Sequence, residues 1–239
     1  QFSPGFQRKL GNRNSPTVLN RLYSKAQFWD GHAASLEEQA LGPVQNPVEM
    51  ANTLPQRVSN LSRITGYKAE FQKAFGSEEI TPDRVAKAIA AFERTVLSGN
   101  SPFDRFQAGD EKAISESAQR GFLVFSVKGN CAECHPLPNF TDEDYHNLGV
   151  GMDKPNPDLG RFEVSKADKD KGAFKTPTLR DIANTGPYLH DGSEKTLEAV
   201  VELYDQGGVR NPWLDPKMKP LKLTKQEEAD LVEFLKTLT

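Results

Sequence analysis

The sequence lacks several features, and each shortage excludes a class of protein. It has only two cysteines in 239 residues, so a zinc site made of four cysteines is excluded. No apolar run approaches the roughly 18 residues of a transmembrane helix. The formal net charge of −3 is too mild to indicate a nucleic acid or an acidic membrane surface as partner. The length leaves room for one or two domains.

Both cysteines fall in one motif, Cys131-Ala132-Glu133-Cys134-His135. Cys-x-x-Cys-His is the attachment motif of a c-type haem. Two thiols on one short helical turn can reach the two vinyl groups of one porphyrin, and the following histidine is then held under the ring as the proximal iron ligand. A disulfide or a redox pair would give no reason for His135, and half of a zinc site would need further ligands. The motif therefore predicts one covalent haem c.

A covalent haem also indicates where the protein works. Haem c is attached on the exported side of the bacterial inner membrane, so we expect a periplasmic protein. The start of the chain has no charged region followed by an apolar region, which fits a mature, processed chain. With both cysteines bound to haem, no disulfide is expected.

The pattern of apolar residues and caps predicts a mostly α protein with long ordered loops and no sheet. A capping box at residues 35–38 begins a helix that we expect to end near Leu41, before Pro43. Thr81-Pro82 begins another, with an apolar stripe from Val85 to Val96. Further helical segments are expected at residues 55–75, 115–127, 178–183, 196–204 and 224–238. The stretch 98–102 (SGNSP) is the best boundary, and it gives domains of residues 1–100 and 101–239.

Several phrases occur in an order that is typical of one family. They are residues 11–17 (GNRNSPT), 28–31 (FWDG), 39–43 (QALGP), 46–50 (NPVEM), 131–135 (CAECH), 175–180 (KTPTLR) and 186–192 (GPYLHDG). Over nearly the whole chain, the sequence resembles the bacterial di-haem cytochrome c peroxidase and MauG family. The resemblance implies two cytochrome c-like helical domains, each with a haem c, a tryptophan between the haems and a calcium ion near the domain interface.

The sequence departs from this family in having no Cys-x-x-Cys-His in its first half. Either the first domain is truncated at its N-terminus and the second haem belongs to a missing segment, or the protein is a one-haem derivative. We expect the first alternative, because Gln39 and Glu49 match the residues that lie over the peroxide-reactive haem in the family. Such a pair suits peroxide cleavage, in which a proton moves from one oxygen to the other. From spacing alone, Glu49 could equally be a solvated loop acid.

The resemblance also implies roles for four other residues. Trp29 matches the tryptophan between the haems, although a packed aromatic is the usual fate of a tryptophan. Asn14 matches the side-chain ligand of calcium, and Thr185 and Pro187 match the residues whose carbonyl groups complete that site. An all-oxygen set of this kind suits calcium.

The second axial ligand of the Cys131/Cys134 haem separates two branches of the family. Tyr204 stands where classical peroxidases have methionine and MauG-like members have tyrosine. A phenolate is a hard anionic donor, which favours ferric iron and makes high-valent iron easier to reach. Alternatively, Tyr204 only ends the apolar stripe of the helix at 196–204. That helix has no methionine, since Met152 and Met218 lie outside it.

Three histidines remain outside the haem motif. We expect His190 to be hydrogen-bonded near the haem without binding iron. His32 is a candidate for contact with a haem propionate, and His146 is expected on the surface.

Three functions fit these observations. The first is a MauG-like oxidoreductase that uses hydrogen peroxide to form high-valent haem and oxidises tryptophan side chains of a partner protein by long-range electron transfer. The second is a peroxidase that reduces hydrogen peroxide with electrons from a small cytochrome or copper protein. The third is a one-haem electron carrier. Tyr204 favours the first, and the presence of Gln39, Glu49 and Trp29 disfavours the third.

Overall fold

The computed structural model describes residues 2–239, which are mainly helical. The α-helices are α1 (Leu36–Gln45), α2 (Leu54–Ser62), α3 (Thr65–Phe75), α4 (Pro82–Glu93), α5 (Pro102–Gln107), α6 (Glu116–Leu123), α7 (Phe162–Ser165), α8 (Leu197–Asp205) and α9 (Lys225–Lys236). Short 3₁₀-helices lie at Phe6–Arg8, Arg21–Tyr23, Cys131–Glu133, Asp168–Asp170 and Ile182–Asn184, and a π-helical turn at Val124–Lys128. Strands β1 (Tyr145–His146) and β2 (Phe174–Lys175) pair antiparallel. The predicted mostly α fold is confirmed, apart from this small ladder.

Serine and threonine caps begin the helices where the sequence indicated. The side chains of Ser35, Thr81, Ser115, Thr196 and Thr224 each accept a hydrogen bond from the backbone amide three residues later, at 3.1–3.2 Å. Each such cap contributes about 1 kcal/mol to helix stability. Local sequence therefore sets where α1, α4, α6, α8 and α9 begin.

Two predicted helix positions were wrong. Helix α1 does not end near Leu41 but continues to Gln45 with Pro43 inside it. A proline removes one amide donor, and burial of Val44 in the following turn favours helix past that point. The helix predicted at residues 178–183 is only the 3₁₀ turn Ile182–Asn184, because Thr178 uses its hydroxyl to hold the carbonyl of Asn139.

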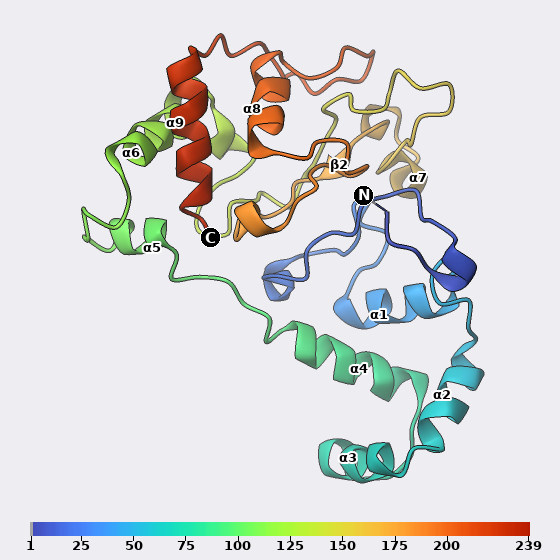
Figure 1. Cartoon of the computed structure of the whole chain (residues 1–239). Helices are drawn as coiled ribbons and strands as arrows, with labels where there is room; N and C mark the ends of the chain where they lie inside the picture. The colour runs from blue at the N-terminus through green and yellow to red at the C-terminus, as the bar shows by residue number, and fades with distance from the viewer. Residues whose placement is uncertain (1) are drawn as a thin grey trace.

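Figure 1 shows α1–α4 grouped apart from α5, α6, α8 and α9, with an extended stretch at residues 94–101 between α4 and α5. The segment before α1 contacts both groups. The Asn20 side-chain amide donates to the carbonyl of Ser98 and to Asn139 Oδ1, at 3.0 and 2.9 Å. The division into domains of residues 1–100 and 101–239 stays a prediction.

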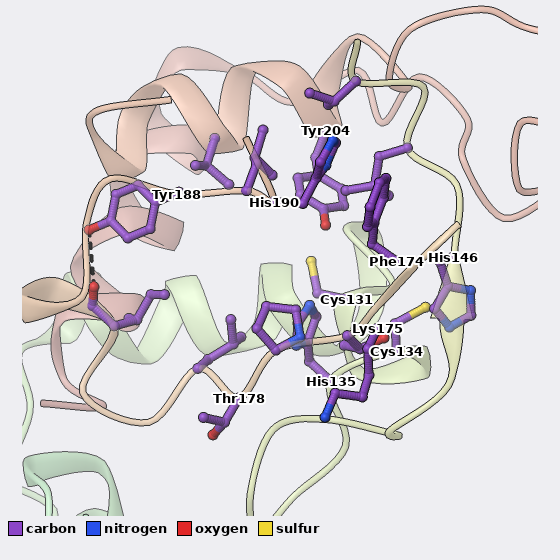
Figure 2. Close-up of a pocket in the computed structure, with 18 of the residues that line it drawn as sticks. Cys131, Cys134, His135, His146, Phe174, Lys175, Thr178, Tyr188, His190 and Tyr204 are labelled. Carbon is purple, nitrogen blue, oxygen red and sulfur yellow. Dashed lines mark hydrogen bonds between the residues drawn. The ribbon is translucent and has the colours of Figure 1, made fainter. Parts of the chain in front are cut away.

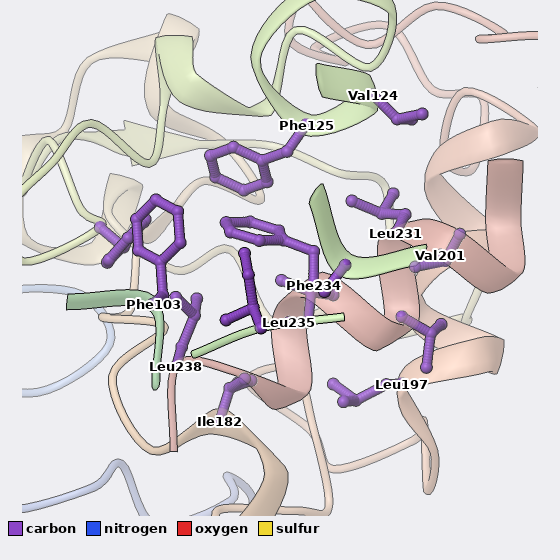
Figure 3. Packing of buried hydrophobic residues seen from close by; sticks show 14 residues of the cluster. Phe103, Val124, Phe125, Ile182, Leu197, Val201, Leu231, Phe234, Leu235 and Leu238 are labelled. Atoms are coloured by element: carbon purple, nitrogen blue, oxygen red, sulfur yellow. The ribbon is translucent and has the colours of Figure 1, made fainter. Parts of the chain in front are cut away.

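The main core lies between α6, α8 and α9 (Figure 3). Its largest fully buried side chains are Phe103, Phe125, Phe140, Phe234 and Leu238. Helices α6 and α9 cross closely at Gly121, where an added Cβ would lie 1.9 Å from the carbonyl oxygen of Asp230. Burial of each such Phe or Leu contributes about 1.5–3 kcal/mol. This core fixes α8 relative to the turn that carries the cysteines.

A smaller core of Phe71, Ile80 and Val85 joins α3 to α4, and Val58 and Leu61 of α2 pack against it. The predicted stripe on α4 is only partly buried, since Phe92 is 68% exposed. None of the helices within residues 2–239 is both long and apolar enough to cross a membrane.

Candidate haem site

A cavity of about 240 Å³ opens beside the turn that carries the two cysteines (Figure 2). The 3₁₀-helix Cys131–Glu133 follows Asn130, whose left-handed φ of 50° turns the chain sharply after the π-helical turn. Figure 2 shows Cys131, Cys134 and His135 on one side of the cavity and Tyr204 on the other. Apolar side chains from α8, α9 and the 174–190 segment complete most of the wall.

His135 is oriented for binding a metal. Its Nδ1 lies 2.8 Å from the carbonyl oxygen of Phe140, so Nδ1–H donates there and Nε2 keeps its lone pair for iron. Burial lowers the pKa of His135, which keeps the imidazole neutral as a metal ligand requires. The fold thus holds His135 in the tautomer that a metal ligand needs.

The two thiols are free in this structure and half-buried at the cavity wall. Burial raises the pKa of the Cys131 thiol to about 12. In the haem-bound protein these sulfurs are thioethers, which carry no charge.

Tyr204 lies in the last turn of α8, whose other face is in the core. Leu197 and Val201 are buried against α9, while the Tyr204 side chain lines the cavity. Its hydroxyl has no hydrogen-bond partner within residues 2–239, and burial raises the pKa of the phenol. Iron would supply both the missing partner and the charge that stabilises phenolate.

The residues present therefore fit a haem c. A histidine with a free Nε2, two thiols on the same turn and a phenol on the opposite wall form a complete donor set for one porphyrin and its iron.

The structure brings together the residues matched to calcium and to the tryptophan. The Asn14 side-chain amide lies 2.7 Å from the carbonyl oxygen of Pro187, and Thr185 stands two residues before Pro187. The Asn14 carbonyl accepts a hydrogen bond from Trp29 Nε1 at 2.8 Å. A rotation of the Asn14 amide would turn its oxygen towards the same place as the carbonyls. Calcium binding by Asn14, Thr185 and Pro187, and electron transfer through Trp29, stay predictions.

Gln39 and Glu49 lie away from this cavity. Gln39 is half-buried on α1, and Glu49 is exposed in the turn after α1, where its carbonyl accepts from the amide of Phe6 at 2.6 Å. Neither side chain lines the cavity beside His135. The roles of Gln39 and Glu49 at a second haem stay predictions.

The expectation that His146 lies on the surface was wrong. Its side chain is only 14% exposed and lines the haem cavity. Nε2 lies 2.9 Å from Asp142, and Nδ1 lies 2.6 Å from Asp215. The hydrogen bond with Asp142 is the main cause that raises the pKa of His146, and the hydrogen bond with Asp215 raises it further, so the ring is charged. Asp142, four residues earlier, was the only local sign of this pairing.

The other two histidines differ in their relation to the cavity. His190 lines it, and its ring stacks on Phe174 at 3.6 Å between centroids instead of forming the expected hydrogen bond. Burial lowers the pKa of His190 to about 4 and keeps it neutral. His32 binds Asp30 at 2.6 Å and stacks on Phe28, outside the lining of this cavity. Contact of His32 with this haem is therefore not supported.

Sequence reasoning missed an arginine that ties the first segment to the second half. Arg13 donates two hydrogen bonds to Asp158, at 2.6 and 2.8 Å, and one to Asp30 at 2.7 Å. These contacts hold the pKa values of both carboxyls below their usual range despite burial. Only the phrase RNSPT marked this place in the sequence.

Comparisons with known proteins find similar sequences and a similar solved structure. The family model described as di-haem cytochrome c peroxidase matches residues 1–112. The methylamine utilization protein MauG of Methylophilus methylotrophus is 44% identical over 230 residues, covering 95% of this chain and 68% of that protein. The cytochrome c551 peroxidase of Nitrosomonas europaea is 39% identical, covering 99% and 68%. A solved MauG-like protein associated with microbial copper homeostasis superposes with a TM-score of 0.89 at 30% identity, covering 99% and 78%.

Proposed function

The chain belongs to the di-haem cytochrome c peroxidase and MauG family, and on that premise we propose that it is a MauG-like haem oxidoreductase. Its oxidant is hydrogen peroxide, and its reductant is a partner protein whose tryptophan side chains lose electrons through long-range transfer. The site of action is the periplasm.

The position of Tyr204 is the observation that carries this proposal. The phenol enters the cavity opposite His135 without a hydrogen-bond partner within residues 2–239. Helix α8 has no methionine, and Met218 lines the cavity from the loop between α8 and α9. A tyrosine oxygen lowers the reduction potential of a haem, whereas a methionine thioether raises it. A low reduction potential suits a haem that is oxidised to a high-valent state during turnover. A high reduction potential suits a haem that must be reduced before the enzyme reacts with peroxide.

When bound, haem supplies the redox chemistry, and the residues of this chain direct it. His135 would bind iron through Nε2, because its Nδ1–H donates to the carbonyl oxygen of Phe140. Trp29 is 9% exposed and held by its bond to Asn14, and it would serve as a rigid electron relay between the two haems. Gln39 would orient peroxide, and Glu49 would take the proton from one peroxide oxygen and return it to the other.

Calcium, if bound by Asn14 with the carbonyls of Thr185 and Pro187, would hold the first segment against the haem cavity. That role is structural, since Asn14 also fixes the indole of Trp29.

The experiment mixes the fully ferric holoprotein with hydrogen peroxide in the absence of reductant and follows the haem absorption bands. A MauG-like protein reacts at once and then oxidises added partner protein, which mass spectrometry detects as oxygen incorporated at tryptophan. A peroxidase instead stays unreactive until one haem is reduced by a cytochrome or copper protein. That second result would contradict the proposal and favour a peroxidase function, the activity for which the Nitrosomonas relative is named.

A further inference from the structure

Two buried cations at the haem cavity converge on one backbone carbonyl. Arg21 Nη2 donates to the carbonyl oxygen of Ala26 at 3.0 Å, and Lys175 Nζ donates to the same oxygen. Arg21 is 9% exposed and Lys175 is 4% exposed, and both line the cavity. Two positive charges that share one neutral acceptor repel each other, so this arrangement requires an anion nearby.

The protein supplies only part of that negative charge. Glu143 lies 3.4 Å from Lys175 Nζ and is itself buried. Arg21 has no ion pair within residues 2–239, because Glu143 and Glu93 act on it only through space. Its Nε and Nη2 donate to the neutral Gln27 Oε1, at 2.9 and 2.7 Å, which leaves Nη1 without a protein partner.

Burial disfavours the charged form of both groups. It lowers the pKa of Arg21, and it lowers the pKa of Lys175 to about 8, with the charge of Arg21 as the next cause. The other charged side chains at the cavity have partners or are exposed: Asp215 binds His146, Lys217 pairs with Glu133 at 3.9 Å, and Lys219 is exposed. Arg21 is therefore the unpaired buried cation of this wall.

We propose that Arg21 is the anion-binding group of the cavity and pairs with a propionate carboxylate of the haem attached at Cys131 and Cys134. Guanidinium and carboxylate form strong charge-assisted hydrogen bonds, and the haem carries two such carboxylates on an otherwise apolar ring. The inference rests on the haem of the proposed function but not on its reaction with peroxide.

The test measures the midpoint potential of this haem by spectroelectrochemistry in the holoprotein and in Arg21→Gln. Ferrous haem carries one more negative charge than ferric haem, so loss of a nearby cation and release of the propionate should disfavour reduction. We expect the ferrous-to-ferric ratio at a fixed poise to fall about tenfold, which is a shift of about 59 mV to lower potential. Arg21→Lys, which keeps the charge, should recover most of the shift.

A pH series separates propionate binding from a general effect of charge. Paired with Arg21, the propionate stays ionised from pH 5 to 8, so the potential changes little. In Arg21→Gln the pKa of the propionate rises into that range, and the potential should become steeply pH-dependent. Arg94→Gln is the matched control, because it removes the same charge from a half-exposed pair with Glu37 outside the cavity.

An unchanged potential and pH slope in Arg21→Gln would overturn the inference, as would an equal shift in Arg94→Gln. If Arg21→Gln does not accumulate, Gln27→Glu decides instead. It places an isosteric anion on Arg21 in competition with the propionate, and it should lower the potential in the same way; no shift would count against the pairing. A holoprotein that shows these shifts but ignores peroxide would contradict the proposed function and leave the role of Arg21 in place.

Discussion

Replacing Tyr204 with phenylalanine tests the proposed iron ligand with little disturbance of the fold. The hydroxyl has no hydrogen-bond partner within residues 2–239, and the ring packs in the last turn of α8. No protein hydrogen bond is lost, so the free energy of unfolding of the apoprotein should change by less than about 1 kcal/mol. The substitution therefore removes one oxygen from the iron site and leaves the wall of the cavity in place.

The effect on the haem should be much larger than the effect on stability. An anionic oxygen stabilises ferric iron, and the choice of axial ligand spans about 0.8 V in haem proteins. We expect Tyr204→Phe to lower the ferric-to-ferrous ratio at a fixed poise by at least ~10²-fold, or about 120 mV, since tenfold is 59 mV for one electron. The ferric spectrum should change as the position opens or another ligand enters.

Tyr188→Phe is the matched control. Tyr188 also lines the cavity, but its hydroxyl donates to the carbonyl of Ile182 at 3.0 Å. This variant should lose about 0.5–1.5 kcal/mol of stability with an unchanged ferric spectrum, the reverse of Tyr204→Phe. The assays are denaturant unfolding of the apoproteins and spectroelectrochemistry of the holoproteins. If Tyr204→Phe keeps the spectrum, the potential and the peroxide reaction of the wild type, the tyrosine only ends the apolar stripe, and the MauG-like proposal fails.

Three further predictions follow from other parts of the site. Glu49→Gln should keep haem content and slow the reaction with peroxide by at least ~10²-fold in stopped-flow absorbance; unchanged kinetics would remove Glu49 from the mechanism. Asn14→Ala should weaken calcium binding by at least ~10-fold in titration calorimetry, and chelation that leaves the spectra and activity of the wild type unaltered would show the site to be absent or idle. His146→Asn should cost about 1–3 kcal/mol at pH 7, because it removes hydrogen bonds from a charged ring to two carboxylates. The wild type should also lose this stability as the pH rises above 6.5, the ordinary pKa of histidine, and through the raised pKa that His146 has in the folded protein. Urea unfolding at pH 7 and 10 measures this loss of stability. If His146→Asn loses as much stability between the two pH values as the wild type, the loss comes from other groups.

Features set by neighbouring residues could be predicted from the sequence. The caps at Ser35 and Thr81 depend on residues three positions apart, and the structure confirms both. The haem motif Cys131–His135 is equally local. The predicted geometry requires only that His135 follow the turn that carries the cysteines. The hydrogen bond from His135 to the carbonyl of Phe140, which fixes the tautomer, appears only in the structure.

Features that join distant segments could not be predicted. Arg13 and Asp158 are 145 residues apart, and His146 and Asp215 are 69 apart. No periodicity links such pairs, because helical and strand patterns relate only residues a few positions apart. His146 therefore looked like a surface residue, and Arg21 like any loop arginine. Only the fold shows that both of them are partly or fully buried at the haem cavity, His146 between two carboxylates and Arg21 without an ion pair within residues 2–239.

A continuous chain of bonds joins these distant segments around Trp29. The amide of Asn14 donates to the carbonyl of His190 at 2.7 Å, and the carbonyl of Asn14 accepts from the Trp29 indole. The carbonyl of Trp29 in turn accepts from the amide of Lys175 at 2.8 Å. The candidate calcium residue is thus one bond from the indole, whereas no bond in this chain includes Cys131 or Cys134. Loss of an ion at Asn14 should therefore act through the position of Trp29, slowing electron transfer between the haems while the covalent attachment of haem stays intact.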